Sequence, residues 1–482
     1  RLFYHSQRFC HLTSADDYRE VVRGFEQHFP NVRVYNNYSP HPVFLTGETM
    51  NHSDWFVLCR NRAQTLAWAE DWAFLGDWSL NTAYECTSFY AELVECAARK
   101  HGYPAGFYVN SNCGGSGQKI FGCLAAGVTW LHLYDWGPLD VWADGSNSWS
   151  DSNPMEYFSI LCATATLGPA DEIIGKGRRE SRRTAILYNR SHEIVNGGRG
   201  RLNHDWMWTF IALKHARIPV EVIIEEDLNP EDLRRYDVVF AGGINLERRH
   251  VTALKRWVED GGLLIGTGGA GCWNVYGEPQ PLSAELFGAR QLEAGADKQA
   301  SLRRVRTPAS DWYPAGEYQS SADLAFILEP TTAKPLGTYG GGECAATINA
   351  VGKGHAILLG FRPGWVFSHN AQSYAGGVRE WLAAPLLKRL GRQRVEFDYG
   401  PVEATLFEHD SGLAVTLAHF GLYAQYGGGW ASPFDVRLSV QTDRPIREVS
   451  SVRRGPLEWK REGDRIEIKG PRLEPVDVVI LK

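Results

Sequence analysis

The segment GVTWLHLYDWGPLD, Gly127–Asp140, carries the pattern from which we predict the fold of this chain. A glycine precedes a short apolar run, and the run ends in Tyr134, Asp135 and Trp136 before a Gly-Pro break. Apolar strands that end in aromatic and acidic residues are typical of α/β barrels, whose sites lie at the carboxyl ends of the strands. An ordinary buried strand with a polar end would account for this one segment equally well.

Side chains on this predicted strand alternate between two faces. Leu131 and Leu133 would face covering helices. Trp130, His132 and Tyr134 would face the barrel axis. We therefore expect the aromatic and polar side chains to lie beside any site that the strand helps to form.

Three segments upstream repeat the combination of strand and helix. The runs that read as short strands are VRVYN at Val32–Asn36, TLAWAED at Thr65–Asp71 and GFYVN at Gly106–Asn110. Helical patterns lie between them, and the first helix is expected to begin at Ser14, in a near capping box, and to end at Pro30. Alternation of strand and helix is the signature of a parallel α/β fold.

Four strand-helix units make half of an eight-stranded barrel. Half a barrel would leave two sheet edges open and one face of the sheet unpacked. Two sources could supply the other half, namely residues that precede Arg1 or a second polypeptide. We favour the first.

The remainder of the chain predicts two further domains. From Thr184 to Gly266 strands alternate with helices, which favours a doubly wound, flavodoxin-like domain, and Gly354–Phe361 reads as a strand that returns to it. From Val395 onward, short runs alternate apolar and polar residues, which favours a small antiparallel β-sandwich. We therefore predict an α/β protein with the C-terminal half of a TIM (β/α)8 barrel at 1–178, a flavodoxin-like domain at 179–394 and a C-terminal β-sandwich at 395–482.

Composition limits the class of partner. The 482 residues include 50 basic and 56 acidic side chains, a formal charge of -6 spread along the chain, which argues against nucleic acid. We interpret the basic run Lys176–Arg183 as a solvated linker. No run approaches the roughly 20 apolar residues of a membrane span and no signal peptide is visible, so we predict no membrane partner.

Cysteine and glycine patterns predict neither a metal nor a cofactor. The nine cysteines are scattered at spacings that match no common zinc site, so we expect reduced thiols and a cytoplasmic protein. The glycine-rich runs Asn112–Gly117 and Gly266–Gly271 carry no dinucleotide fingerprint and no P-loop lysine. We expect both runs to form tight turns.

The predicted flavodoxin-like domain shows no catalytic pattern of its own. Glutamine amidotransferases, which share this fold, place a nucleophilic cysteine after a strand, whereas Gly243, Ile244 and Asn245 follow the strand DVVFAG here. We therefore expect a structural role. The 17 tryptophans of the chain, several of them near proposed strand ends, could stack on sugar rings, although tryptophan also fills cores.

The order of half barrel, flavodoxin-like domain and small β domain resembles the β-galactosidases of glycoside hydrolase family 42. VYNNYS at Val34–Ser39 looks like that family's strand ending in Thr-Asn, and Trp55–Trp72 resembles its strand ending in an acidic residue and an aromatic. LAAGVTWLHLYDW at Leu124–Trp136 resembles the family's join between a small-residue helix and an aromatic strand. GKGHAILLGF resembles the strand that closes the family's middle domain.

The resemblance implies where the catalytic residues of a glycosidase would lie. The family's general acid/base ends the fourth strand, which would precede Arg1, and its nucleophilic glutamate ends the seventh, where this chain has Asn110. An amide cannot be the nucleophile of a retaining glycosidase, which needs two carboxyl groups about 5 Å apart. The family's middle domain carries its trimer contacts, so the resemblance also implies a homo-oligomer, by analogy a trimer.

Other strand ends would then have to supply the carboxylates. Glu70 is the first candidate, with its neighbour Asp71 on the opposite face of the strand. Asp135 ends the last strand, and Glu48 lies in the loop after VYNNYS. These carboxylates could instead bind sugar hydroxyls or pair with loop arginines. The residues expected to bind the sugar are Asn37, Trp72, Asn110, Asn112, His132, Tyr134 and Trp136.

The resulting hypothesis is hydrolysis of a glycosidic bond, in a β-galactoside or a related glycoside. A non-catalytic carbohydrate-binding or scaffold protein on the same fold is the alternative. A sugar-directed transferase or lyase is a third reading.

Overall fold

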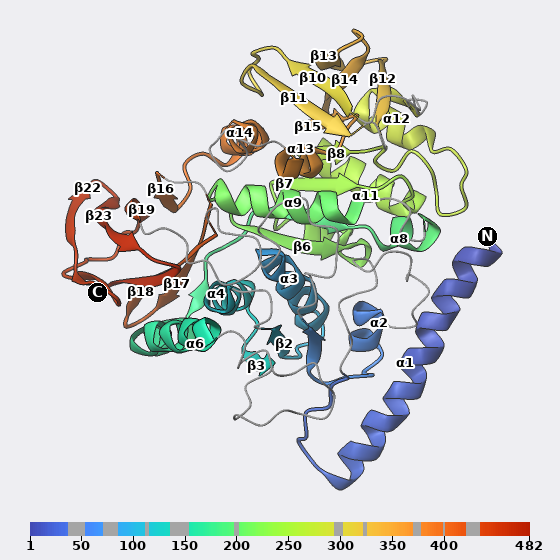
Figure 1. Cartoon of the computed structure of the whole chain (residues 1–482). Coiled ribbons are helices and arrows are strands. Elements are labelled where there is room, and N and C mark those ends of the chain that lie inside the picture. Colours follow the sequence, from blue (N-terminus) through green and yellow to red (C-terminus); the bar gives the residue numbers. More distant parts are fainter. Residues whose placement is uncertain are drawn as a thin grey trace. The chain divides into compact units, whose positions relative to one another are not determined.

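A computed structural model of the chain describes residues 1–36, 54–70, 85–110, 115–134, 154–196, 202–293, 302–321, 325–369, 377–398, 401–420 and 434–482. The described residues form two compact units, whose elements are drawn in Figure 1. The first unit comprises residues 1–10 and 182–391. The second comprises residues 392–482 together with the described residues between 11 and 181.

The N-terminal part of the second unit contains a parallel sheet of strand order β1-β2-β3. Helix α3 connects β1 to β2 and helix α4 connects β2 to β3, as expected for strand-helix units. The elements of this part of the chain are α1 (Leu2–His28), α2 (Trp55–Arg60), β1 (Ala67–Glu70), α3 (Cys86–Arg99), β2 (Ala105–Asn110), α4 (Ser116–Ala126), β3 (Trp130–Tyr134), α6 (Pro154–Leu167), η5 (Gly168–Ala170), α7 (Asp171–Lys176) and β4 (Arg178–Arg179).

Helix α1 begins at Leu2, so the start predicted at Ser14 is wrong. Its N-terminal residues belong to the first unit, where Tyr4 is 4% exposed and its hydroxyl lies 3.2 Å from the hydroxyl of Ser191. A contact between residues 187 positions apart leaves no local pattern in the sequence. Ser14 therefore lies inside the helix and caps nothing.

The strand predicted at Val32–Asn36 is also absent from the described sheet. Val34 makes the backbone contacts to the segment before β1: its carbonyl accepts from the Thr65 N–H at 2.8 Å and the Leu66 N–H at 3.2 Å, and its N–H donates to the Thr65 hydroxyl at 2.9 Å. One further hydrogen bond between these two described segments runs from the Asn36 side-chain amide to the Ala63 carbonyl at 3.4 Å. The side chain of Thr65 thus takes the place of a backbone partner. A β-ladder needs the same backbone pairing at successive residues, so the segment is extended without being a strand.

The first unit contains a nine-stranded sheet of order β11-β10-β13-β14-β15-β8-β7-β5-β6. Strands β15, β8, β7, β5 and β6 are parallel neighbours in the flavodoxin-like order, and the remaining four extend the sheet in antiparallel fashion. Strands β9 and β12 pair antiparallel in a separate two-stranded sheet. The strands of this unit are β5 (Thr184–Tyr188), β6 (Val220–Ile224), β7 (Val238–Gly242), β8 (Leu263–Thr267), β9 (Ala289–Glu293), β10 (Leu302–Thr307), β11 (Gly316–Ser321), β12 (Phe326–Pro330), β13 (Lys334–Tyr339), β14 (Cys344–Val351) and β15 (Gly354–Leu359).

Helices pack on both faces of the parallel strands, as in other doubly wound domains. On one face, Leu187, Val239 and Leu264 belong to one buried cluster with Leu254 and Trp257 of α11. On the other, α9 and α13 lie side by side (Figure 1). The helices are α8 (Arg190–Asn196), α9 (Leu202–His215), η6 (Glu225–Asp227), α10 (Pro230–Leu233), α11 (Arg248–Glu259), α12 (Pro281–Phe287), α13 (Pro363–His369) and α14 (Val378–Leu390).

The C-terminal part of the second unit is a β-sandwich. One sheet has the order β16-β19-β23-β22 and the other β21-β20-β24-β18-β17-β4, and buried side chains of both form one core. The strands are β16 (Val395–Phe397), β17 (Val402–His409), β18 (Gly412–His419), β19 (Phe434–Gln441), β20 (Val449–Ser451), β21 (Gly455–Pro456), β22 (Glu458–Glu462), β23 (Arg465–Leu473) and β24 (Val476–Leu481).

The basic run predicted as a solvated linker is partly structural. Arg178 and Arg179 form β4, which pairs with β17, so the run completes a sheet of the sandwich. The Arg179 guanidinium also donates to the carbonyls of Ala125 and Ala126 at the end of α4 and pairs with Glu95 at 3.2 Å. Lysine and arginine near a helix C-terminus satisfy its free carbonyls, which explains why this arginine is held in place.

The fold class predicted from the sequence is thus found in the described residues. None of the helices in this part of the chain is both long and apolar enough to cross a membrane. The division into domains at 178 and 394 stays a prediction.

Candidate active site on the three-stranded sheet

The register of the three-stranded sheet aligns one residue from each strand. Glu70 of β1 pairs with Tyr108 of β2, and Tyr108 pairs with His132 of β3. Residues in register on parallel strands share a face, and neighbouring strands lie roughly 4.8 Å apart. A carboxylate, a phenol and an imidazole therefore lie in line on one face, and we call these three residues the inner row.

Aromatic rings surround the inner row. The Tyr108 and His132 rings are stacked, with centroids 4.7 Å apart and an angle of 28° between their planes. Trp68, which shares the face of Glu70, meets Tyr108 edge-on at 4.9 Å, and Tyr35 stacks on Trp68 at 4.4 Å. Stacked and edge-on pairs are the favoured arrangements of aromatic rings, so each ring restricts the position of the next.

Gly106 provides the space that this packing needs. It pairs in register with Trp68 on one side and with Trp130 on the other. A Cβ atom at Gly106 would lie 2.2 Å from the Trp68 ring and 3.2 Å from the Cβ of Trp130. Only glycine therefore lets the Trp68 indole lie against β2 next to Tyr108.

Exposure increases across the sheet from β1 to β3. Trp68 is 3% exposed and Glu70 is 9% exposed, whereas Trp130 is 51% exposed and His132 is also exposed. The leucines between them on β3 are half-buried, in agreement with the alternation predicted for that strand. The face thus offers an open aromatic surface beside a buried carboxylate. Such surfaces bind the C–H face of a ring and place a polar group at its edge.

The sheet brings together two of the residues predicted for the site. Glu70 and His132 both belong to the inner row. Asn110 and Tyr134 pair in register at the carboxyl ends of β2 and β3, which fixes their backbones beside each other. The other predicted residues lie outside the described residues; they are Asn37, Glu48, Asp71, Trp72, Asn112, Asp135 and Trp136.

Two residues of the site were not predicted from the sequence. Tyr108 stands two positions before Asn110 in GFYVN, and the alternation used for the later strand would have placed both on one face. Tyr35 gave no such signal, because its segment is not a strand and its contact with Trp68 is tertiary.

The fold that carries this site is that of GH42 β-galactosidases. The structure resembles a GH42 beta-galactosidase from G. stearothermophilus at 17% identity and a TM-score of 0.65, and a beta-galactosidase from Rahnella sp. at 15% and 0.68. It also resembles alpha-L-fucosidase isoenzyme 2 from Paenibacillus thiaminolyticus at 14% and 0.64. The alignments cover 95%, 99% and 97% of this chain and 65%, 68% and 71% of the three proteins, respectively.

Residues 183–374 match the family model of the beta-galactosidase trimerisation domain. The resemblance to glycoside hydrolase family 42 predicted from the sequence is confirmed. A comparison with curated proteins finds no match. The chain spans 65% of the length of the G. stearothermophilus protein.

The packing around Gly106 yields a first prediction. Gly106→Ala should lower the free energy of unfolding by about 1–3 kcal/mol, because the added methyl group overlaps the Trp68 ring and forces it off Tyr108. Gly168→Ala is the control, since no atom lies within 4 Å of the added Cβ there. Urea unfolding followed by tryptophan fluorescence measures both changes. Equal midpoints for Gly106→Ala and the unchanged protein would contradict the packing described here.

Proposed function

We propose that this chain is a glycoside hydrolase-like protein that acts on a β-galactoside or a related glycoside through carboxylates at strand ends. The observation that carries the proposal is the inner row, Glu70, Tyr108 and His132, on the open face of a sheet whose fold is shared with known glycosidases. The fucosidase among the similar structures acts on a different sugar, so the fold alone does not choose the substrate.

In this proposal, Glu70 supplies one of the two carboxyl groups of the reaction. It ends β1 and is 9% exposed, so it combines a strand-end position with a largely desolvated carboxyl group. Catalytic side chains of barrel enzymes come from the carboxyl ends of the strands, which supports this role for Glu70. A glycosidase needs a second carboxyl group, and we propose that Asp71, Asp135 or Glu48 supplies it.

The aromatic residues are proposed to hold the sugar. Trp130 presents a half-exposed indole on the same face as the inner row, and an indole face packs well against the C–H groups of a pyranose ring. Tyr108 and His132 can bind sugar hydroxyls with their polar atoms. We propose the same role for Asn37, Trp72, Asn110, Asn112, Tyr134 and Trp136.

One observation favours a second candidate function, a carbohydrate-binding protein without catalysis. Asn110 ends β2, where the family resemblance leads us to expect a nucleophilic glutamate. An amide at that place keeps the ability to bind a hydroxyl and loses the ability to attack the sugar.

Oligomerisation and location form the remainder of the proposal. The match of residues 183–374 to a trimerisation domain supports an oligomer, and we propose a trimer. We also propose a cytoplasmic location, because the eight cysteines in the described ranges form no disulfide bonds.

Glu70→Gln tests the proposed catalysis. The substitution keeps the shape of the side chain and removes its proton transfer, so kcat/KM for a chromogenic β-galactoside should fall by about 10²–10⁴. Glu462→Gln is the matched control, because Glu462 is exposed on β22 of the C-terminal sandwich and should leave the rate unchanged. A near-normal rate in Glu70→Gln would remove Glu70 from the mechanism. Sugar binding by the unchanged protein without any turnover would instead favour the non-catalytic function.

The proposed trimer is tested by its mass in solution. Sedimentation velocity of the chain should give a species of about three times 53.9 kDa at micromolar concentration, because the trimerisation domain is present over most of the first unit. A single species with the mass of one chain would contradict the oligomer.

A further inference from the structure

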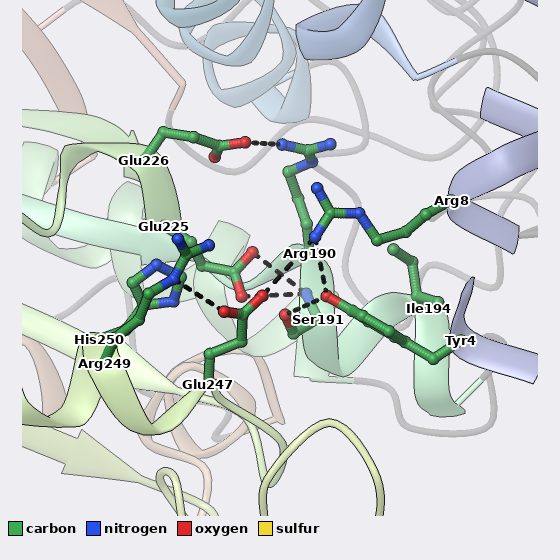
Figure 2. Close-up of a pocket in the computed structure, with 10 residues that line it drawn as sticks. All are labelled: Tyr4, Arg8, Arg190, Ser191, Ile194, Glu225, Glu226, Glu247, Arg249 and His250. Carbon is green, nitrogen blue, oxygen red and sulfur yellow. Dashed lines mark hydrogen bonds and ion pairs between the residues drawn. The ribbon is translucent and has the colours of Figure 1, made fainter. Parts of the chain in front are cut away.

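Charged and polar side chains gather at the carboxyl ends of β5, β6 and β7 in the first unit (Figure 2). They surround a cavity of about 20 Å³, room for one water molecule. The residues that line it, which we call the carboxyl-edge cluster, are Tyr4, Arg8, Arg190, Ser191, Ile194, Glu225, Glu226, Glu247, Arg249 and His250.

The cluster lies at the switch point of the doubly wound sheet. Strand β5 lies between β6 and β7 in the sheet. The connection that follows β5 leads to β6 on one side, and the connection that follows β6 crosses back to β7 on the other side, so the connections diverge at β5. In such sheets the crevice at this point is open and commonly binds a ligand. Here the N-terminal residues of α1 occupy it.

Two residues of α1, Tyr4 and Arg8, line the cavity. The Tyr4 hydroxyl lies 3.2 Å from the Ser191 hydroxyl, and the Arg8 guanidinium donates to Tyr4 at 3.3 Å and lies 3.6 Å from a carboxylate oxygen of Glu247. Tyr4 is 4% exposed. Figure 2 shows both side chains pointing from α1 into the cluster. They therefore form one wall of the cavity.

Glu225 lies on the opposite side of Ser191 from Tyr4. Its carboxyl oxygens accept from the Ser191 backbone N–H at 3.2 and 3.3 Å, and the side chain is 6% exposed. Two neighbouring arginines form ion pairs with other carboxylates: Arg190 pairs with Glu226 at 2.8 Å, and Arg249 pairs with Glu247 at 2.8 Å. Within the described part of the chain, Glu225 forms no ion pair of its own.

We propose that this contact is a proton-controlled latch, in which the N-terminal residues of α1 stay docked while the Glu225 carboxyl group is protonated and are released when it ionises. Ionised Glu225 would be a buried charge without a cation paired to it, which is costly in a desolvated site. Release of α1 removes the wall formed by Tyr4 and Arg8, so water reaches the carboxylate and removes that cost.

The charged groups around Glu225 support this assignment. Burial raises the pKa of Glu225 from 4.5 to about 7, against the lowering effects of Ser191 and Arg190, and the carboxylate of Glu226 raises it further. Burial raises the pKa of Tyr4 above 10.0 and lowers that of His250 to about 4, so both move away from neutral pH. The other charged groups that face the cluster are Arg8 from α1, Arg190 from α8, Glu226 from η6, and Glu247 and Arg249 at the start of α11.

The sign of the effect follows from linkage. The docked state has the higher Glu225 pKa, so it binds the proton more tightly than the released state. Docking of α1 is therefore strongest below pH 4.5, the ordinary pKa of a glutamate, and weakens as the pH rises. Once the pH is well above 7, protonation of Glu225 no longer stabilises the docked state. With these two values, the released fraction should rise by about tenfold between about pH 6 and pH 8.5.

Hydrogen–deuterium exchange of the full chain tests the latch. After correction for the intrinsic pH dependence of exchange, protection of the amides at residues 6–10 should fall by about tenfold between about pH 6 and pH 8.5. Amides of β8, in the middle of the same sheet, serve as the internal reference for global opening. An unchanged protection of residues 6–10 relative to β8 would overturn the proposal.

Two matched variants separate the latch from a general loss of stability. Glu225→Gln keeps an acceptor for the Ser191 N–H and cannot ionise, so protection of residues 6–10 should change by less than about twofold over the same range. Glu226→Gln makes the same chemical change one residue away and leaves Glu225 able to ionise, so a fall in protection should remain, reduced because the Glu226 carboxylate no longer raises the Glu225 pKa. A full pH-dependent fall in Glu225→Gln, or its loss in Glu226→Gln alone, would overturn the assignment to Glu225.

Discussion

Parallel pairing of strands is the constraint on which both sites of this protein depend. It brings the carboxyl ends of neighbouring strands to one edge and puts residues in register on one face. In the three-stranded sheet, this places Glu70, Tyr108 and His132 in line. In the flavodoxin-like sheet, the same geometry gathers Ser191, Glu225 and the start of α11 around one cavity. The two sites differ because aromatic side chains stay exposed on the first sheet, whereas residues of α1 lie over the carboxyl edge of the second.

Packing decides how each edge is used. On the three-stranded sheet, the missing side chain of Gly106 lets Trp68 support Tyr108 from the side, and Trp130 and His132 remain exposed. On the flavodoxin-like sheet, the buried side chains of Tyr4 and Glu225 line the same small cavity. An open aromatic face suits reversible binding of a ring, whereas a filled crevice with a buried acid suits a contact that responds to pH.

Local patterns in the sequence predicted most of the fold. The features that were missed depend on contacts between residues far apart in the sequence. The apolar runs Gly106–Asn110 and Gly354–Phe361 predicted β2 and β15 to within two residues of their observed bounds. Glu70 and His132 were predicted from strand ends and from alternation along a strand. The start of α1 was missed because Tyr4 is held by a residue 187 positions away. Tyr35 was missed for the same reason, and no pattern near Glu225 indicates that a helix from the N-terminus covers it.

The central claim is that the aromatic face of the three-stranded sheet binds a sugar. Its most direct test is a crystal structure of the chain soaked with galactose at a saturating concentration. The account predicts a pyranose ring against Trp130, with hydroxyls within hydrogen-bond distance of the inner row. A sugar bound only on another surface, or no bound sugar at all, would contradict it.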